Sequence, residues 1–335
     1  MIKKVLKNIY NDIKKHYITY LVYLLFVVSL FIHFDYYIYS SGGLVDLKDR
    51  IKVDNSYETK GSINLTYVSV RKSNIYNILL SYVIKDWDLV KMDNSRLDNE
   101  SSKEIFERDK IYLKETSYDA VIAAFKEANK QYDILKNDVT ITYVYSFAKS
   151  NVKAGDIVLS INNTSISNVN DISNILDNLN ENDKLNIKVK RNNKEKDCYA
   201  YVVKEKDRNL IGIAIANIKE VKTTPKVEYV FNDNESGSSR GLMCALDIYN
   251  KIAEYDLTKG DIIAGTGSID QDGKVISIDG VKYKLKGAVK KKANVFIVPT
   301  DNYEEAILEK EKNNYDIEII EADTLHNVIE KLINR

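Results

Sequence analysis

The longest apolar run of the chain lies near its N-terminus. Residues 17–34 read YITYLVYLLFVVSLFIHF without a charged side chain, and five lysines precede them within residues 1–16. Eighteen helical residues rise about 27 Å, which suits one crossing of a bilayer. The pattern predicts a transmembrane anchor over residues 17–39, with a basic tail (1–16) in the cytoplasm and the rest of the chain outside. A cleaved signal peptide is the alternative, but a small-x-small cleavage site is not evident after Phe34.

The next segment, residues 40–131, mixes strand and helix patterns. Apolar and polar residues alternate from Ser62 to Arg71, which predicts a half-buried strand. A helix is predicted from Ile75 to Val90, and Ser117 is placed to cap another helix that continues to Lys130. We therefore expect an extracytoplasmic α/β region without visible catalytic chemistry.

A third pattern covers residues 132–206. It contains the strand-like VTITYVY from Val139, the turn and strand KAGDIVLSINN from Lys153, a helix over residues 170–179 and a strand from Lys184 to Arg191. These runs resemble a PDZ domain of the bacterial protease-associated type.

The PDZ resemblance implies a groove that binds an extended chain end, such as a peptide C-terminus, by strand addition to a sheet edge. PDZ domains usually hold the ligand carboxylate with a glycine-bearing loop, yet residues 131–154 contain no glycine. A spacer or an atypical binder is therefore the alternative to a peptide-binding domain.

The C-terminal part, residues 207–335, combines strand-like and helical patterns. LIGIAIANI from Leu210 is typical of a buried strand, and residues 268–275 are typical of a strand, a turn and a strand. A buried helical stripe follows Gly241, and its members are Leu242, Met243, Leu246, Tyr249 and Ile252. The whole chain is predicted to be an α+β multidomain protein.

Composition and charge exclude several classes of function. The 335 residues allow two or three domains, and 49 basic residues balance 49 acidic ones. This balance gives no reason to expect a nucleic-acid partner. The only cysteines are Cys198 and Cys244, far apart and without the spacing of a zinc or redox site. Cys244 falls in the predicted buried helix, so a disulfide framework is not expected.

Histidine, metal and nucleotide chemistry also lack support. Of three histidines, His16 and His33 belong to the N-terminal segment, and His326 lies in the capped amphipathic stretch TLHNVIEKLI. Asp270 and Asp272 faintly suggest a calcium loop, but the other spaced carboxylates are missing, which favours a hairpin turn. The phosphate-binding pattern GxxxxGK[ST] does not occur. No cofactor or metal is predicted.

Candidate chemistry begins at Gly237-Ser238-Ser239-Arg240-Gly241. Ser239 lies at the start of the predicted helix, on its inward face. A hydroxyl there meets unpaired backbone N–H groups and the positive end of the helix dipole. These are the components of a nucleophile beside an oxyanion hole. An N-capping serine is the simpler alternative.

A second candidate is Lys284 in IDGVKYKLKGAVKKK, which starts at Ile278. Val281, Leu285, Ala288 and Val289 form the apolar face of a predicted helix, and Lys284 lies at its edge. Burial lowers a lysine pKa from about 10.4 toward neutrality, as a lysine general base requires. A lysine that extends its ammonium group to solvent is the alternative.

Together, GSSRGLMCALDIYNKI, DIIAGTGSIDQDGKVISIDGVKYK and ANVFIVP resemble the proteolytic domain of Lon-type serine peptidases. The resemblance implies that Ser239 is the nucleophile, since it matches the middle of the family's Gly-Pro-Ser-Ala-Gly motif. It implies that Lys284 is the base, at the end of Gly-Gly-x-x-x-Lys, and that Thr266 helps to position it. With Gly237 and Arg240 as supporting residues, the chain resembles bacterial membrane-anchored PDZ–Lon-like proteases.

Three residues depart from these motifs. Ser238 replaces the proline, Arg240 replaces the small residue after the nucleophile, and Asp279 replaces the first glycine of the lysine motif. Arg240 could narrow the cleft or select acidic substrate residues. The alternatives are therefore a catalytically impaired PDZ/Lon-like scaffold that binds peptides, or a structural envelope protein.

For a chain with this resemblance, the missing phosphate-binding pattern predicts ATP-independent cleavage of unfolded or membrane-proximal proteins. Because the chain has no phosphate-binding loop of its own, ATP-driven unfolding would need another protein. The expected partners are protein or peptide substrates, the lipid bilayer and further copies of the chain in a homo-oligomer.

Overall fold

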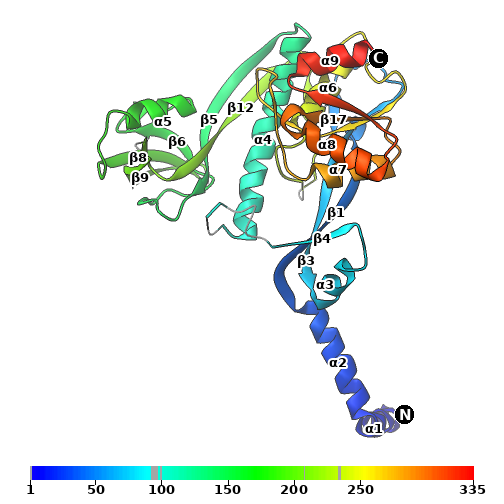
Figure 1. Ribbon diagram of the computed structural model, residues 1–335. Helices are drawn as coiled ribbons and strands as arrows, with labels where there is room; N and C mark the ends of the chain where they lie inside the picture. The colour runs from blue at the N-terminus through cyan, green and yellow to red at the C-terminus, as the bar shows by residue number, and fades with distance from the viewer. Residues whose placement is uncertain (1, 92–96, 99, 207, 233–234) are drawn as a thin grey trace. The chain divides into compact units, whose positions relative to one another are not determined.

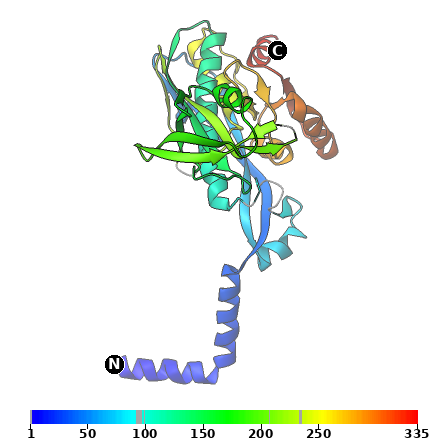
Figure 2. The same cartoon turned by 90° about the vertical axis from the view of Figure 1, so that its left-hand side faces the viewer.

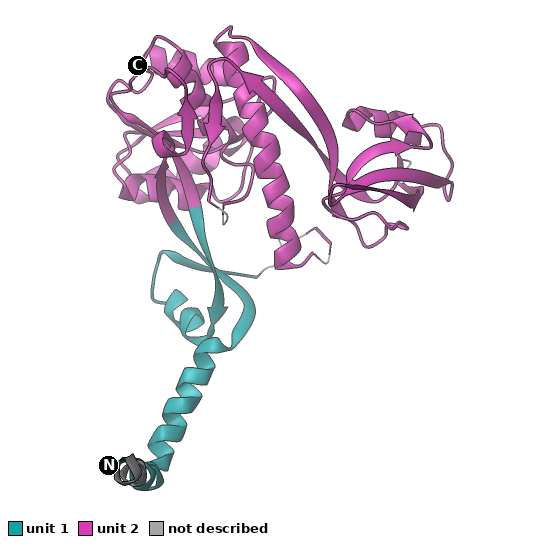
Figure 3. Cartoon of the chain, turned by 180° about the vertical axis from the view of Figure 1, so that it is seen from behind, with its two compact units in different colours: residues 1–41, 68–95 teal, residues 42–67, 96–335 magenta. Residues whose placement is uncertain are grey.

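A computed structural model describes residues 2–91, 97–98, 100–206, 208–232 and 235–335 (Figure 1). Met1 of the predicted basic tail lies outside the described residues. The chain divides into two compact units, one of residues 1–41 with 68–95 and the other of residues 42–67 with 96–335 (Figure 3). Strands β1 (His33–Asp46) and β3 (Ser62–Asn74) each contribute residues to both units.

The first unit contains the N-terminal helices and one end of each of these strands. Its other elements are α1 (Ile2–Lys15), α2 (Tyr17–Phe31), α3 (Ile75–Ser81) and β4 (Trp87–Lys91). Strand β4 pairs antiparallel with β1, with Tyr36 opposite Lys91 and Ser40 opposite Trp87.

These elements differ from two sequence-based predictions. The apolar run over residues 17–39 forms a 15-residue helix and then enters β1, because Tyr36 to Ser40 pair with β4. Within the described parts of the chain, no helix has the length and apolar character needed to traverse a membrane. The predicted helix from Ile75 to Val90 ends at Ser81, since the residues from Trp87 form β4.

The second unit holds a parallel sheet with helices on both faces. Its strands follow the order β18 (Glu318–Ala322), β17 (Val295–Pro299), β14 (Ile262–Gly265) and β3. The helices are α4 (Ser102–Glu127), α6 (Gly241–Ile252), α7 (Val281–Lys290), α8 (Thr300–Asn313) and α9 (Leu325–Ile333).

Alternation along the strands explains the two helical layers. Ile297 packs in one core with residues of α4, α6 and α9, whereas its neighbours Phe296 and Val298 pack in another with residues of α7 and α8. Successive side chains of a strand point to opposite faces, so each face acquires its own core. Figure 1 shows α6 and α9 on one side of β17, and α7 and α8 on the other.

The second unit also contains short elements. They are η1 (Leu47–Asp49), β2 (Ile51–Val53), β13 (Val227–Tyr229), β15 (Ser268–Ile269) and β16 (Val275–Ile276). The predicted strand–turn–strand over residues 268–275 is confirmed, and the Asp270 carboxylate accepts hydrogen bonds from the N–H groups of Asp272 and Lys274 inside the turn.

Helix α4 starts earlier than predicted. Ser101 and Glu104 form a capping box, so the helix begins at Ser102 and Ser117 lies in its middle. The Ser117 hydroxyl donates to the carbonyl of Leu113 at 2.6 Å rather than capping a helix.

The region predicted to be PDZ-like forms a second sheet, in the order β12-β5-β6-β8-β9 with β7 beside β6. The strands are β5 (Tyr132–Val144), β6 (Ile157–Ile161), β7 (Thr164–Ser165), β8 (Lys184–Arg191), β9 (Lys194–Tyr201) and β12 (Ile213–Thr223). The hairpin β10 (Val203–Glu205) and β11 (Arg208–Leu210) precedes β12, and α5 (Val169–Leu176) packs in the same core.

Strand β12 is the strand predicted from LIGIAIANI, but its partner is β5. The two pair antiparallel from Ile213 opposite Val144 to Thr223 opposite Tyr132, and Figure 2 shows them in green and yellow-green as two long neighbouring strands. Residues that follow the predicted boundary at residue 206 thus complete the sheet that precedes it.

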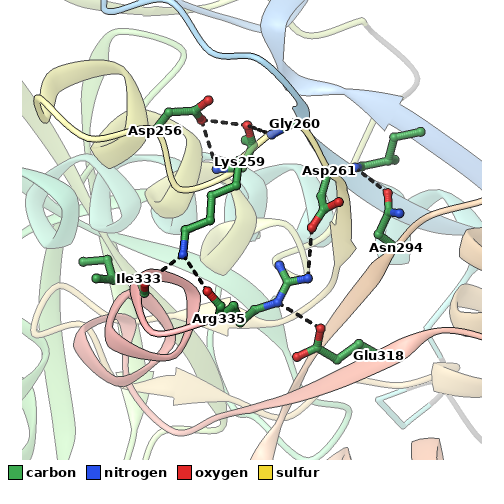
Figure 4. A network of polar contacts seen from close by, with 10 residues as sticks. Asp256, Lys259, Gly260, Asp261, Asn294, Glu318, Ile333 and Arg335 are labelled. Carbon is green, nitrogen blue, oxygen red and sulfur yellow. Dashed lines mark hydrogen bonds and ion pairs between the residues drawn. The ribbon is translucent and has the colours of Figure 1, made fainter.

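A polar network ties the last helix to the parallel sheet (Figure 4). The guanidinium of Arg335 donates to Glu318 and Asp261, both at 2.9 Å. Lys259 Nζ donates to the carbonyls of Ile333 and Arg335 at 2.7 and 3.0 Å. These contacts fasten the end of α9 beside β14 and β18.

Candidate active site

Ser239 lies in a turn directly before α6. The helix begins at Gly241 with Arg240 as its N-cap residue, which confirms the predicted helix start. The Gly241 N–H donates to the Ser238 carbonyl at 3.1 Å and closes the turn. Gly237 has a φ of +91°, a conformation that glycine adopts without steric cost. Ser239 is half-buried there.

The turn is joined to the residues that follow β14. The Ser239 carbonyl accepts hydrogen bonds from the Gly267 N–H at 2.9 Å and from Thr266 Oγ1 at 3.1 Å. The Leu242 N–H donates back to the Gly267 carbonyl at 3.0 Å. These three bonds fix the backbone of the turn relative to the parallel sheet.

Lys284 approaches the same threonine from α7. The residue is 5% exposed, and its Nζ donates to Thr266 Oγ1 at 3.1 Å. A hydroxyl has one proton and two lone pairs, so Thr266 can accept from Lys284 while it donates to Ser239. The structure thus brings together all three predicted residues. Among the described hydrogen bonds, none joins Ser239 Oγ to Lys284 Nζ directly.

The environment of Lys284 makes its neutral amine easier to form than that of a lysine in solvent. Burial lowers the pKa of Lys284 to about 8, and the negative charges of Asp279 and Glu305 oppose this shift. The predicted burial of Lys284 is therefore confirmed, and its pKa lies near the range that a general base needs. Asp279, noted in the sequence as a departure, acts on the base as a nearby charge.

Arg240 is held by its own neighbours. Its Nη1 lies 2.9 Å from Glu235, and its guanidinium carbon lies 4.5 Å from the ring centre of Phe231. Arg50 also pairs with Glu235, at 3.2 Å. Two cations thus share one carboxylate, which commits the Arg240 side chain to this cluster.

Comparison with known families matches two parts of the chain. Residues 123–200 match the PDZ domain, and residues 234–335 match the Lon protease (S16) C-terminal proteolytic domain. None of the curated proteins matches the chain. The chain carries a PDZ domain and a Lon-type serine protease domain. This combination fits a PDZ–Lon-like serine protease, in agreement with the resemblance read from the motifs.

Other candidate residues of the chain take structural positions. His326 lies in the predicted capped helix, α9, where it contacts Glu127 at 2.7 Å and Glu330 at 3.4 Å. Glu127 and Glu330 raise the pKa of His326, mainly through the hydrogen bond and charge of Glu127. Cys198 and Cys244 are both free and buried, the latter within α6.

The sheet that contains the PDZ match has a glycine at the start of β12, outside residues 131–154. Gly212 has a φ of +69° and directly precedes β12, which lies at one end of the strand order of the PDZ sheet. A Cβ on Gly212 would lie 2.7 Å from that of Ala148, so the position requires glycine. The Asn209 side chain ties this loop to α5 through the carbonyls of Leu176 and Leu179.

Sequence reasoning missed several residues around the protease site. Glu235 accepts a hydrogen bond from Arg240, and Glu305 acts on Lys284 through its charge. Neither glutamate belongs to the motifs that marked Ser239 and Lys284. For Gly212 a signal existed, because the Ile-Gly-Ile sequence directly opens a strand. Gly212 lies outside residues 131–154, where a carboxylate-binding glycine was expected.

Proposed function

We propose that the chain is an ATP-independent serine endopeptidase in which Lys284 is the general base for Ser239. The observation that supports this most directly is the contact chain from Lys284 Nζ through Thr266 Oγ1 to the Ser239 backbone. A lysine that is 5% exposed and has a pKa of about 8 is costly as a purely structural residue. It is suited to accept a proton from a nearby hydroxyl.

The proposed reaction is acyl transfer. Neutral Lys284 takes the proton of the Ser239 hydroxyl, and Ser239 Oγ attacks the scissile carbonyl. The proton then passes from Lys284 to the leaving amine, and water releases the acyl group from Ser239. The N–H groups of Ser239 and Arg240 donate to no described residue, so they are available to hold the oxyanion at the start of α6.

Unfolded or membrane-proximal proteins are the proposed substrates. A Lon-type domain implies protein substrates and a PDZ domain implies peptide binding, while the phosphate-binding pattern of ATP-driven unfoldases does not occur in the sequence. We expect the protein to cleave chains that are already extended. Efficient cleavage of a stably folded substrate by the purified protein would contradict this.

For the PDZ domain, we propose that a peptide C-terminus adds to the β12 edge beside α5. In the order β12-β5-β6-β8-β9, β12 has β5 as its one partner strand among the described residues, and on its other edge the Asn217 N–H donates to Glu115 of α4. Gly212 opens this strand, and the N–H groups of Ile211 and Gly212 donate to no described residue. Such N–H groups can receive a terminal carboxylate.

The test of the proposed peptidase is hydrolysis of an unfolded protein by the wild-type chain and by three serine and lysine variants. We expect Ser239→Ala and Lys284→Ala each to lower kcat by at least about 10³-fold, because nucleophile and base act as one unit. Ser238→Ala is the matched control, since its hydroxyl lies one position away, and it should retain activity. Full activity in Ser239→Ala would contradict the proposal.

The second candidate is a catalytically impaired scaffold that binds peptides. One observation favours it, namely that Lys284 Nζ bonds to Thr266 and not to Ser239 Oγ. Catalytic hydrogen bonds are often longer before the substrate binds, so this observation does not by itself exclude catalysis. A wild-type chain that binds peptides but hydrolyses none between pH 6 and 9 would favour the scaffold.

We further propose that the N-terminal segment associates with a membrane. Every residue of α2 is at least partly exposed, and the apolar residues of this helix have no buried face of their own. Lys14 and Lys15, at the end of α1, are exposed cations that suit anionic lipid headgroups. Cell fractionation of the full chain tests this, with a chain starting at residue 40 as the control. Recovery of both chains from the supernatant would contradict it.

A further inference from the structure

Helix α4 supports the Ser239 turn from outside the matched Lon domain. The Asp109 carbonyl accepts the Gly237 N–H at 2.9 Å, and Thr116 Oγ1 donates to the Ser238 carbonyl at 3.3 Å. Thr116 is 3% exposed. Gly237 and Ser238, the two residues that precede Ser239 in the turn, are therefore both bonded to α4.

Thr116 differs from the hydroxyl beside it. A serine or threonine inside a helix can bond to its own helix carbonyl four residues earlier, and Ser117 does this with Leu113. Thr116 instead bonds to Ser238, 122 residues away in the chain. Gly241 also packs closely against Thr116, because a Cβ on Gly241 would lie 2.2 Å from Thr116 Oγ1. The contact is thus specific to the Ser239 turn.

The same helix contacts the PDZ domain with an adjacent stripe of residues. Glu115 Oε1 accepts the N–H of Asn217 in β12 at 2.9 Å. One turn later, Asp119 pairs with Lys219 at 2.6 Å, and both side chains are largely buried. Residues four apart lie on one face of a helix, so Glu115 and Asp119 together contact β12, through the backbone of Asn217 and the side chain of Lys219.

We propose that Thr116 is a positioning residue for Ser239, and that α4 couples it to the β12 edge of the PDZ domain. This inference rests on the proposed function. Glu115 and Thr116 are consecutive residues of a 26-residue helix, so a shift of α4 moves both contacts. A peptide that adds to β12 next to Asn217 therefore acts on the turn that carries Ser239.

The first experiment compares Thr116→Val with Thr116→Ser and Ser117→Ala in the full chain, using hydrolysis of unfolded casein. Valine keeps the shape of threonine but lacks the hydroxyl. We expect Thr116→Val to lower kcat by about tenfold to 10²-fold with little change in KM, because misplacement of a reacting group by about 1 Å has effects of that size. Thr116→Ser should restore kcat, and Ser117→Ala should leave it unchanged.

The second experiment tests the coupling at Asn217. Asn217→Pro removes the N–H that Glu115 accepts, and proline is tolerated on an edge strand when its N–H is not needed by the ladder. Asn217→Ala keeps that N–H and is the control. We expect a fall in kcat of about fivefold or more in the proline variant only, at the lower end of typical coupling between sites. Equal rates in the two variants would overturn the coupling.

Hydrogen exchange separates this inference from the proposed function. The amides of Gly237 and Gly241 should exchange faster in Thr116→Val than in Ser117→Ala, whether or not the chain hydrolyses casein. An inactive wild-type chain would contradict the proposed function, and the exchange result would still decide the role of Thr116. Unchanged exchange together with unchanged kcat in Thr116→Val would overturn that role.

Discussion

The two halves of the candidate dyad are supported in different ways. Lys284 is held within the Lon-type domain: it projects from α7, is buried, and donates to Thr266 of the same domain. Ser239 is half-buried, and its turn is bonded to α4 and lies beside a cluster in which Arg50 and Arg240 share Glu235. The base is thus held by its own domain, whereas the turn of the nucleophile is bonded both to its own domain, at Thr266 and Gly267, and to α4, which precedes the matched Lon domain.

This difference indicates where control of activity is possible. A buried lysine has its pKa set by packing, which changes little without unfolding. A turn that is held by hydrogen bonds from other segments moves when those segments move. We therefore expect substitutions near Lys284 to change the chemistry or its pH dependence, and substitutions around Ser239 to change how well the turn is held.

Thr266→Val should have the largest effect among substitutions outside the dyad, because Thr266 is bonded to both halves. The valine removes the acceptor of Lys284 and the donor to Ser239 while it keeps the side-chain volume. We expect kcat to fall by about 10²-fold, measured with a peptide substrate. Thr266→Ser retains the hydroxyl and is the control; a similar loss in both variants would mean that the methyl group, not the hydroxyl, matters.

Local periodicity accounts for the parts of the site that could be predicted. The apolar stripe after Gly241 predicted α6, and the position of Lys284 beside Val281 and Leu285 predicted the burial of Lys284 in α7. In each case the residues that form the pattern lie close together along a single helix. Strand β8 was predicted with its observed limits for the same reason, since its alternation is complete within eight residues.

The parts of the fold and the site that could not be predicted from the sequence depend on tertiary contacts. The residues of β4 belong to a run with a helical pattern and become a strand only because β1 lies beside them. The first half of α4 is rich in charged residues, so its start at Ser102 was missed, although the Ser101 and Glu104 capping box was present in the sequence. Nothing near Thr116 in the sequence indicates that it contacts Ser238.

Glu235→Gln tests the charge cluster that lies beside the Ser239 turn. The substitution removes the charge that Arg50 and Arg240 share in a largely buried cluster. We expect the free energy of unfolding to fall by about 1.5–3 kcal/mol, as for the loss of a hydrogen bond to a charged group, measured by urea denaturation. Glu228→Gln is the control, because its pair with Lys226 is exposed and its loss should not be measurable. Equal stability of both variants would show that the cluster does not hold the turn.

Asp279→Asn tests the lysine side and should have the smallest effect. In the wild type, the pKa of Lys284 is about 8, and the charge of Asp279 raises it against the effect of burial. Since the neutral amine is the active form, kcat/KM should rise with pH through about pH 8. Removal of the Asp279 charge lowers the pKa further, so this rising limb should move to lower pH and the rate at pH 7 should increase. Glu305→Gln should move it in the same direction by less, and Asp272→Asn, in an exposed turn, should not move it. A limb that stays in place in Asp279→Asn would mean that Lys284 is not the group that titrates.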